Sequence, residues 1–208
     1  MFGDGGLTFQ EFMVREPLPL STIHDAVLDF LRDREDAVLF GAQAVNAYVD
    51  EPRMTQDVDI QALRADEFAV ELREYLNLKF SVAIRDRDAG RGLGIRLYQL
   101  QKPKNRHLVD IRRVDVLPPS ERVQGVLVVS PPELIAGKVK AYMQRIGSAK
   151  SFTDRRDLVV LFTAFPELKT EDGEVRDRLV AQGADPKILA AWADLVATEI
   201  REEADDGY

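Results

Sequence analysis

Two aspartates in the stretch RMTQDVDI (53–60) stand at a spacing that suits metal binding. The apolar Val58 and Ile60 alternate with Asp57 and Asp59, which is the period of a half-buried strand even though aspartate is a poor strand former. Residues i and i+2 of a strand point to the same face, so the two carboxylates could hold one divalent cation, Mg²⁺ or Mn²⁺, between them. The alternative interpretation is that both aspartates only cover the solvent side of the strand.

A third carboxylate from a neighbouring strand would extend this site. Asp110 lies between apolar residues in HLVDI, and Asp115 in RVDVL is the competing candidate. Three carboxylates on adjacent strands can bind two metal ions that stabilise the entering and leaving oxygens of a phosphoryl-type transfer. We choose Asp110 because the strand pattern around it is the cleaner of the two.

A glycine turn precedes the two aspartates and could approach a phosphate. The apolar run AVLF (37–40) predicts a short buried strand, Gly41 ends it, and AQAVNAYV (42–49) has helical composition. Glycine lets the backbone come close to a ligand, and the first N–H groups of a helix are unpaired within the helix. The alternative is an ordinary strand-to-helix glycine.

The helical C-terminal third places charges beside apolar stripes. Lys138 and Arg145 are seven residues apart and share one edge of a predicted helix, from which Lys140 should point away. On the next helix, Asp154 and Asp157 fall on the line of the apolar residues, so both should lean inward. Buried charge needs a partner. Either these residues form a structural network, or the cations bind triphosphate and one acid orients or deprotonates an attacking hydroxyl.

The elements that must position these residues alternate along the chain. Strands are predicted at 37–40, 57–63, 79–85, 93–101, 106–113 and 125–129, and helices at 21–33, 42–49, 65–76, 131–146, 153–165, 171–182 and 185–203. Ser130 and Glu133 predict a capping box for the helix at 131. This order predicts an α+β fold, a mixed sheet flanked by helices. We expect a core of residues 1–130 and a helical part, 131–208, packed on it.

Composition limits the chemistry. The chain of 208 residues has no cysteine and two histidines, which excludes disulfides and thiolate or histidine-rich metal sites. Its net charge is −8, yet the segment 85–113 is basic and could meet a polyanion. No apolar run is long enough for a membrane helix, and the start MFGDGG lacks the basic residues of a secretory signal, so we expect a cytoplasmic protein.

Together these segments resemble the nucleotidyltransferase superfamily, whose signature is a strand, a glycine pair opening a helix, and an Asp-x-Asp strand. Here FGAQAVNAYVDEPRMTQDVDI carries that signature. The closer resemblance is to the AbiEii/AbiGii family of abortive-infection nucleotidyltransferases, which includes toxins of type IV toxin–antitoxin systems. That family adds a lysine and an arginine on one helix and Asp-x-x-Asp on the next, matched here by GKVKAYMQR and DRRD. The resemblance covers residues 38–161.

The resemblance assigns a role to each candidate residue. The implied nucleotide-binding positions are Gly41, Ala42, Lys138, Arg145 and Asp154. The implied catalytic positions are Asp57, Asp59, Asp110 and Asp157, of which the first three would be metal ligands and Asp157 the acid nearest the chemistry. Lys140 is a second register for the lysine. Ala42 stands where the family usually has a second glycine or a serine, which removes a hydroxyl contact to phosphate but keeps the backbone donors.

The resemblance implies a transferase that uses a nucleoside triphosphate and Mg²⁺ or Mn²⁺. We expect it to move a nucleoside monophosphate onto an acceptor hydroxyl, with RNA such as a tRNA 3′ end as the acceptor, and to have a cognate antitoxin. Two other interpretations stay open. One is a catalytically silent relative that binds RNA or a partner protein through residues 85–113, and the other is the same chemistry on a small molecule or on protein hydroxyls.

Overall fold

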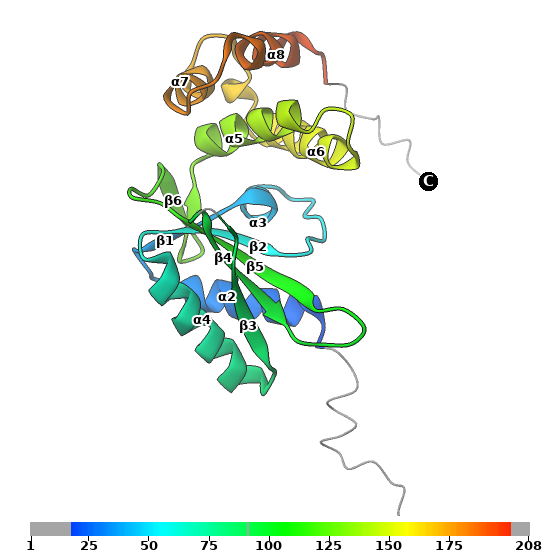
Figure 1. The fold of residues 1–208 in the computed structure, drawn as a ribbon. Helices are drawn as coiled ribbons and strands as arrows, with labels where there is room; N and C mark the ends of the chain where they lie inside the picture. Colours follow the sequence, from blue (N-terminus) through cyan, green and yellow to red (C-terminus); the bar gives the residue numbers. More distant parts are fainter. Residues whose placement is uncertain (1–17, 91, 201–208) are drawn as a thin grey trace, which may run out of the picture.

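The computed structural model describes residues 18–90 and 92–200, which form a mixed sheet covered by helices (Figure 1). The strands are β1 (Ala37–Phe40), β2 (Val58–Ala62), β3 (Ile84–Asp88), β4 (Gly94–Gln99), β5 (Arg106–Arg113), β6 (Ser120–Val123) and β7 (Val126–Val129). They form one 7-stranded sheet in the order β3-β4-β5-β2-β1-β7-β6. Strand β2 runs parallel to β5 and antiparallel to β1, which in turn is parallel to β7. The predicted α+β class is confirmed.

The helices form separate layers on the two sides of this sheet (Figure 1). They are α2 (Leu20–Leu31), α3 (Gly41–Asn46), α4 (Ala65–Phe80), α5 (Pro131–Gln144), α6 (Ala149–Ala164), α7 (Glu174–Ala181) and α8 (Pro186–Ala197), with a short 3₁₀ turn at Pro166–Leu168. Helices α2 and α4 lie on one side, whereas α5 to α8 lie together on the other. No helix in the described ranges is long and apolar enough to cross a membrane.

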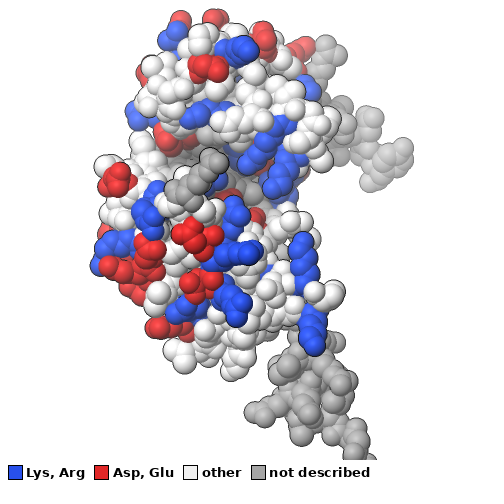
Figure 2. All heavy atoms as spheres, in the orientation of Figure 1, with Lys and Arg blue, Asp and Glu red and all other residues white. Residues whose placement is uncertain are grey.

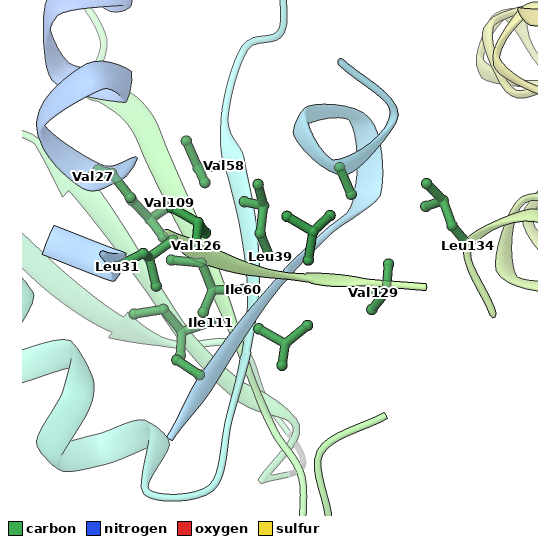
Figure 3. Close-up of a cluster of buried hydrophobic side chains, with 14 of the residues drawn as sticks. Val27, Leu31, Leu39, Val58, Ile60, Val109, Ile111, Val126, Val129 and Leu134 are labelled. Carbon is green, nitrogen blue, oxygen red and sulfur yellow. The ribbon is translucent and has the colours of Figure 1, made fainter. Parts of the chain in front are cut away.

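The alternation in β2 decides which side chains enter the core. Val58 and Ile60 are fully buried and pack with Val109 and Ile111 of β5, and Figure 3 shows them facing Val27 of α2. The intervening residues of β2 therefore point to the opposite face, as the sequence predicted. That face is turned toward the α5–α8 layer.

One element prediction was wrong, one strand was missed and one helix ends earlier than predicted. The predicted strand 79–85 begins in a helix, because α4 continues to Phe80 and ends at Ser81, whose φ of 52° is left-handed; β3 starts only at Ile84. Strand β6 was not predicted, because its sequence SERV is a polar edge strand without a clear apolar period. The predicted helix 185–203 stops at Ala197, and its last predicted residues lie outside the described part of the chain.

Candidate active site

One cross-strand row of side chains carries the predicted carboxylates. Asp59 pairs with Asp110 across the parallel β2–β5 ladder and with Phe40 across β1, and Asp110 pairs with Arg96 of β4. Paired residues on neighbouring strands share a face of the sheet. The sequence made Asp110 a third ligand on the condition that its strand lies beside that of Asp59; β5 does lie beside β2, and the register places Asp110 next to Asp59.

Asp57, directly before β2, is held by a histidine. Its Oδ2 lies 2.9 Å from Nδ1 of His107, and this hydrogen bond lowers the pKa of the Asp57 carboxyl and raises that of the His107 imidazole. Asp110 is held in the same way, with Oδ2 accepting from Nε of Arg96 at 3.2 Å. Asp110 therefore has a cationic partner close by, and Asp57 has a histidine whose protonated form it favours.

In this row, Asp59 is the acid whose charged form is destabilised by its surroundings. Burial raises the pKa of its carboxyl to about 6, and the negative charges of Asp57 and Asp110 act in the same direction, while the positive charges of Arg112 and Lys138 oppose the shift. A carboxylate that is buried beside two others favours any cation that can neutralise it.

Gly41 makes room for Asp59. It opens α3 directly after β1 with a φ of 72°, and a Cβ atom built on it would overlap the Asp59 carboxylate oxygen. Only glycine fits this position, for both its backbone conformation and its lack of a side chain. Ala42 follows as the second residue of α3.

A cavity of about 490 Å³ lies between this face of the sheet and helix α5. Its size is ordinary for a small-molecule site. The sheet side contributes Phe40, Gly41, Asp59, Gln61, Arg112 and Val129, and the helical layer contributes Glu133, Leu134, Gly137, Lys138, Lys140, Ala141, Gln144, Arg145, Asp154 and Gln182. Among the described residues, this lining brings together the predicted Gly41, Asp59, Lys138, Arg145 and Asp154, and it leaves out Ala42, Asp57, Asp110 and Asp157.

Asp157 lies behind the cavity wall and holds two cations. Its side chain is 0% exposed, Lys138 donates to Oδ2 at 2.7 Å, and Arg53 donates to both oxygens at 2.8 and 3.0 Å. Burial by itself would raise the pKa of the Asp157 carboxyl, but these hydrogen bonds hold it below its usual value. Arg53 was not among the predicted residues, and it joins the chain just before Asp57 to helix α6.

Lys138, Lys140 and Arg145 of α5 and its C-terminal end form the basic wall of the cavity. Nη1 of Arg145 donates to Asp154 at 2.9 Å, and Lys138 also approaches Asp154 at 3.7 Å. Lys140 was expected to point away, but it lines the cavity and donates to the Gln182 carbonyl at 2.7 Å. Gln182 lies at the end of α7, far from Lys140 in the sequence. The periodicity of α5 therefore could not predict this contact.

A polar network fixes the loop that carries Arg53. The Asn46 side chain donates to the Arg53 carbonyl at 2.8 Å and accepts from the Arg53 amide at 3.0 Å. Gln43 donates to Thr55 at 2.9 Å and lies 3.1 Å from Nδ1 of the buried His24. The loop between α3 and β2 is thus anchored to α3 on one side and, through Arg53, to α6 on the other.

The donor chemistry fits a divalent cation. Carboxylate oxygens are the ligands that Mg²⁺ and Mn²⁺ prefer, and the pKa of the Asp59 carboxyl is raised by burial first and then by its acidic neighbours, so a bound cation would stabilise its charged form. In the arrangement described for residues 18–90 and 92–200, no three His, Asp or Glu side chains converge on one point as metal ligands. Asp57 and Asp110 are instead turned to His107 and Arg96, so both would have to reorient to join Asp59.

The residues that sequence analysis missed are mostly cations that pair with the predicted acids. Arg96, His107 and Arg53 each contact one of those acids, and Arg112 lines the cavity with its guanidinium 4.6 Å from the Phe40 ring centroid. The basic segment 85–113 was interpreted as a surface for a polyanion, and the pairing of its Arg96 and His107 with the predicted acids depends on strand register, which the sequence does not show.

Comparison with known proteins places this site in a family. The family model described as "Nucleotidyl transferase AbiEii toxin, Type IV TA system" matches residues 25–208. The fold is similar to JHP933 from Helicobacter pylori, with a TM-score of 0.57 and 16% identity over 92% of each chain. A nucleotidyltransferase described as putative, also from H. pylori, gives a TM-score of 0.52 and 15% identity over 85% of this chain and 91% of that one.

A third similar structure is the Megavirus polyadenylate synthase, with a TM-score of 0.55 and 12% identity over 71% of this chain and 32% of the viral one. At these identities the likeness is one of fold. No curated protein sequence matches the chain. The family match covers most of the chain and agrees with the resemblance found in its motifs, and the chain therefore belongs to the AbiEii family of nucleotidyltransferase toxins of type IV toxin–antitoxin systems.

Proposed function

We propose that this nucleotidyltransferase moves a nucleoside monophosphate from a nucleoside triphosphate to a hydroxyl of RNA in a reaction that depends on Mg²⁺ or Mn²⁺. A tRNA 3′ end is the RNA acceptor that the family resemblance suggests. The observation that carries the proposal is that Asp59, packed against Gly41, lines the same cavity as Lys138 and Arg145. An acidic metal-binding group thus faces two cations across a space that fits a nucleotide.

In this proposal the nucleotide binds with its phosphates toward the basic wall. Lys138 and Arg145 neutralise the triphosphate, and the Gly41 turn with Ala42 lets backbone N–H groups approach it. Asp154 lines the cavity beside both cations and keeps their side chains in place. The charge of the triphosphate is opposite to that of the wall it contacts.

Asp57, Asp59 and Asp110 would hold the metal. When bound, the metal stabilises the charge that develops on the phosphate oxygens. The acceptor hydroxyl oxygen forms a bond to the α-phosphorus, the bond from that phosphorus to the bridging oxygen breaks, and pyrophosphate leaves. We propose that the proton of the acceptor hydroxyl moves to the Asp110 carboxylate, because this carboxylate lies in the row beside Asp59.

Asp157 has a different role in this proposal. A general base must reach the proton that it takes, and Asp157 is buried with both oxygens bound to Arg53 and Lys138. We propose that it positions Lys138 toward the phosphates and Arg53 against the loop before Asp57. It would then be necessary for activity without contacting the substrate.

Cations beside Asp57 favour RNA as the acceptor. Lys150 of α6 is exposed, and its positive charge helps to lower the pKa of the Asp57 carboxyl. Arg155 and Arg156 are exposed on the same helix. Figure 2 shows Lys and Arg side chains gathered beside the hollow between the helical layer and the sheet. A polyanionic acceptor could approach there although the chain is acidic as a whole.

The test is transfer of label from each of four α-labelled nucleoside triphosphates to total RNA, with and without Mg²⁺. Wild type should label RNA only with metal, and Asp57→Asn and Asp59→Asn should not. Asp172→Asn removes an equal charge at a side chain that is 91% exposed outside the site and should keep full activity.

If label appears on protein or on small molecules in a lysate and not on RNA, the acceptor is not RNA, but the proposed transferase activity stands. Loss of both transfer and metal-dependent nucleotide binding would overturn the function as a whole. We further propose a cytoplasmic protein with a cognate antitoxin. Expression without the antitoxin should then arrest growth, and Asp59→Asn should relieve the arrest.

A further inference from the structure

His24 of α2 is a buried residue that the proposed reaction does not use, and a chain of hydrogen bonds fixes the groups around its ring. The Asn46 side chain donates to the Arg53 carbonyl at 2.8 Å and accepts from the Arg53 amide at 3.0 Å, which fixes the positions of its Nδ2 and Oδ1 atoms. The same Nδ2 donates to Oε1 of Gln43 at 3.2 Å. The amide nitrogen of Gln43 is therefore the group that lies 3.1 Å from Nδ1 of His24.

This chain of hydrogen bonds also determines where the proton of His24 lies. Because an N–H donor of Gln43 faces Nδ1, that ring nitrogen accepts, and the proton of a neutral imidazole is carried by Nε2. Burial lowers the pKa of the His24 imidazole and so favours the neutral form, although the charge of Asp57 acts in the opposite direction. His24 therefore presents an N–H donor at Nε2.

The Nε2 donor of His24 has no acceptor. His24 is 6% exposed, and its Nε2 atom is buried without a hydrogen-bond partner among the described residues. Buried donors in folded proteins are nearly always paired, and an unpaired one calls for an explanation. Since the neighbouring groups hold the ring so closely, we look for a partner that reaches Nε2 in another state of the protein.

Asp57 is the acid best placed to become this partner. Gln43 also donates to Thr55 at 2.9 Å, two residues before Asp57, so His24 lies beside the segment that leads into Asp57. Among the charged groups that shift the pKa of His24, Asp57 has the largest effect, and His24 in turn helps to lower the pKa of the Asp57 carboxyl. Both histidines of the chain thus act on Asp57, and His107 is the one that is hydrogen-bonded to it.

The other state is the one in which Asp57 joins Asp59 at the cation. Asp57 is turned to His107, with 2.9 Å between Oδ2 and Nδ1, and it would have to leave this partner to hold a metal. Carboxylates that bind a metal are themselves held by hydrogen bonds from neighbouring groups. Once Asp57 has turned from His107, it needs a new donor.

We propose that His24 is the positioning residue of Asp57: its Nε2–H donates to one carboxylate oxygen when Asp57 turns from His107, and the other oxygen is left for the cation. His24 acts through Asp57 and does not touch the substrate. This inference rests on the proposed function and adds to it the residue that holds Asp57 in its metal-binding orientation.

Two replacements of His24 separate the Nε2 donor from the bond to Gln43. Asparagine places an amide where Nδ1 lies and has no donor that reaches the position of Nε2. Glutamine places its amide nitrogen near Nε2 and leaves Gln43 without its acceptor. In His24→Asn, the dissociation constant for Mn²⁺, measured by electron paramagnetic resonance of the free ion, should rise by about tenfold or more. His24→Gln should bind Mn²⁺ nearly as wild type does.

A double-mutant cycle tests whether His24 acts through Asp57. Asp57→Asn should weaken Mn²⁺ binding by itself, and His24→Asn should add nothing to that loss, because the carboxylate that His24 holds is gone. Label transfer to RNA should follow Mn²⁺ affinity, with His24→Gln well above His24→Asn.

A purely structural His24 would give the reverse order. His24→Asn, which keeps the bond to Gln43, would then bind Mn²⁺ normally, and His24→Gln would not. This reverse order, an equal loss in both variants, no loss in His24→Asn, or additive losses in the cycle would each overturn the inference while leaving the transferase intact. A wild-type protein that neither binds Mn²⁺ nor transfers label would overturn the proposed function itself.

Discussion

At the scale of single residues, the site depends on one glycine whose missing side chain leaves space for a carboxylate. We expect Gly41→Ala to reduce transfer by on the order of a hundredfold, because the new Cβ displaces the Asp59 carboxylate from its place in the row. The measurement is the rate of label transfer at saturating nucleotide.

Gly147→Ala is the matched control for this change. Gly147 also has a left-handed φ, of 85°, but a Cβ atom there meets nothing within 4 Å. Both variants carry the same kind of backbone strain, and only Gly41→Ala collides with Asp59. Equal loss of activity in both variants would show that strain and not the collision is responsible.

Asp59 itself should lower the stability of the metal-free protein. Asp59 is half-buried, and the pKa of its carboxyl is raised first by that burial and then by the charges of Asp57 and Asp110. Asp59→Asn removes the charge at nearly constant shape, so in EDTA near pH 8 we expect the free energy of unfolding to rise by about 1–2 kcal/mol. Denaturant unfolding measures this, and a variant less stable than wild type would contradict it.

At the scale of elements, the contact between Asp157 of α6 and Arg53 of the α3–β2 loop joins two parts of the site. Asp157→Asn leaves Arg53 and Lys138 without their buried counter-ion, so we expect a loss of about 3 kcal/mol in the free energy of unfolding at pH 7. Denaturant unfolding of wild type and variant gives this difference. Nucleotide transfer should fall as well, because Lys138 loses its position.

The same contact predicts a pH dependence of a definite sign. The pKa of the Asp157 carboxyl in the folded protein lies below the ordinary value of 3.8. A carboxylate of this kind adds stability above its unfolded pKa and loses it as the pH falls through its folded pKa. The stability difference between wild type and Asp157→Asn should therefore be complete at pH 7 and shrink below about pH 4. A difference that grew in acid would contradict this account.

Some contacts of the site could be predicted from the sequence, and others could not. The period of two in both strands predicted the face on which Asp59 and Asp110 lie once the strands pair, but that β5 is the neighbour of β2 was an assumption that only the structure could test. The partners of Asp157 and Lys140 were not predicted, since Arg53 and Gln182 lie in a loop and at a helix end far along the chain. Glu133 was expected to form a capping box, but α5 begins without a side-chain cap and Glu133 pairs with Gln182.

At the scale of the whole molecule, an acidic chain must still attract its acceptor. We expect Lys150→Glu to raise the KM for RNA and weaken its dependence on salt, because Lys150 is an exposed cation beside Asp57. The KM for the nucleoside triphosphate should not change, since the cavity binds it elsewhere. Transfer rates measured over a range of RNA and KCl concentrations test this.

Lys187→Glu makes the same change in net charge on α8 and serves as the control. If both variants lose RNA affinity equally, the effect belongs to overall charge and not to the surface near Asp57.

The site is assembled from segments that the ribosome delivers at very different times. Gly41 and Asp59 emerge early, Asp110 comes with β5, and Lys138 gains its buried counter-ion only when Asp157 of α6 has been made. Pairing between such distant segments is slow to form and cannot begin before the later one exists. A nascent chain therefore has no complete site for most of its synthesis, and a message cut short before α6 encodes a fragment without one. If these residues form the active site as proposed, a member of this toxin family has no activity until α6 has been synthesised.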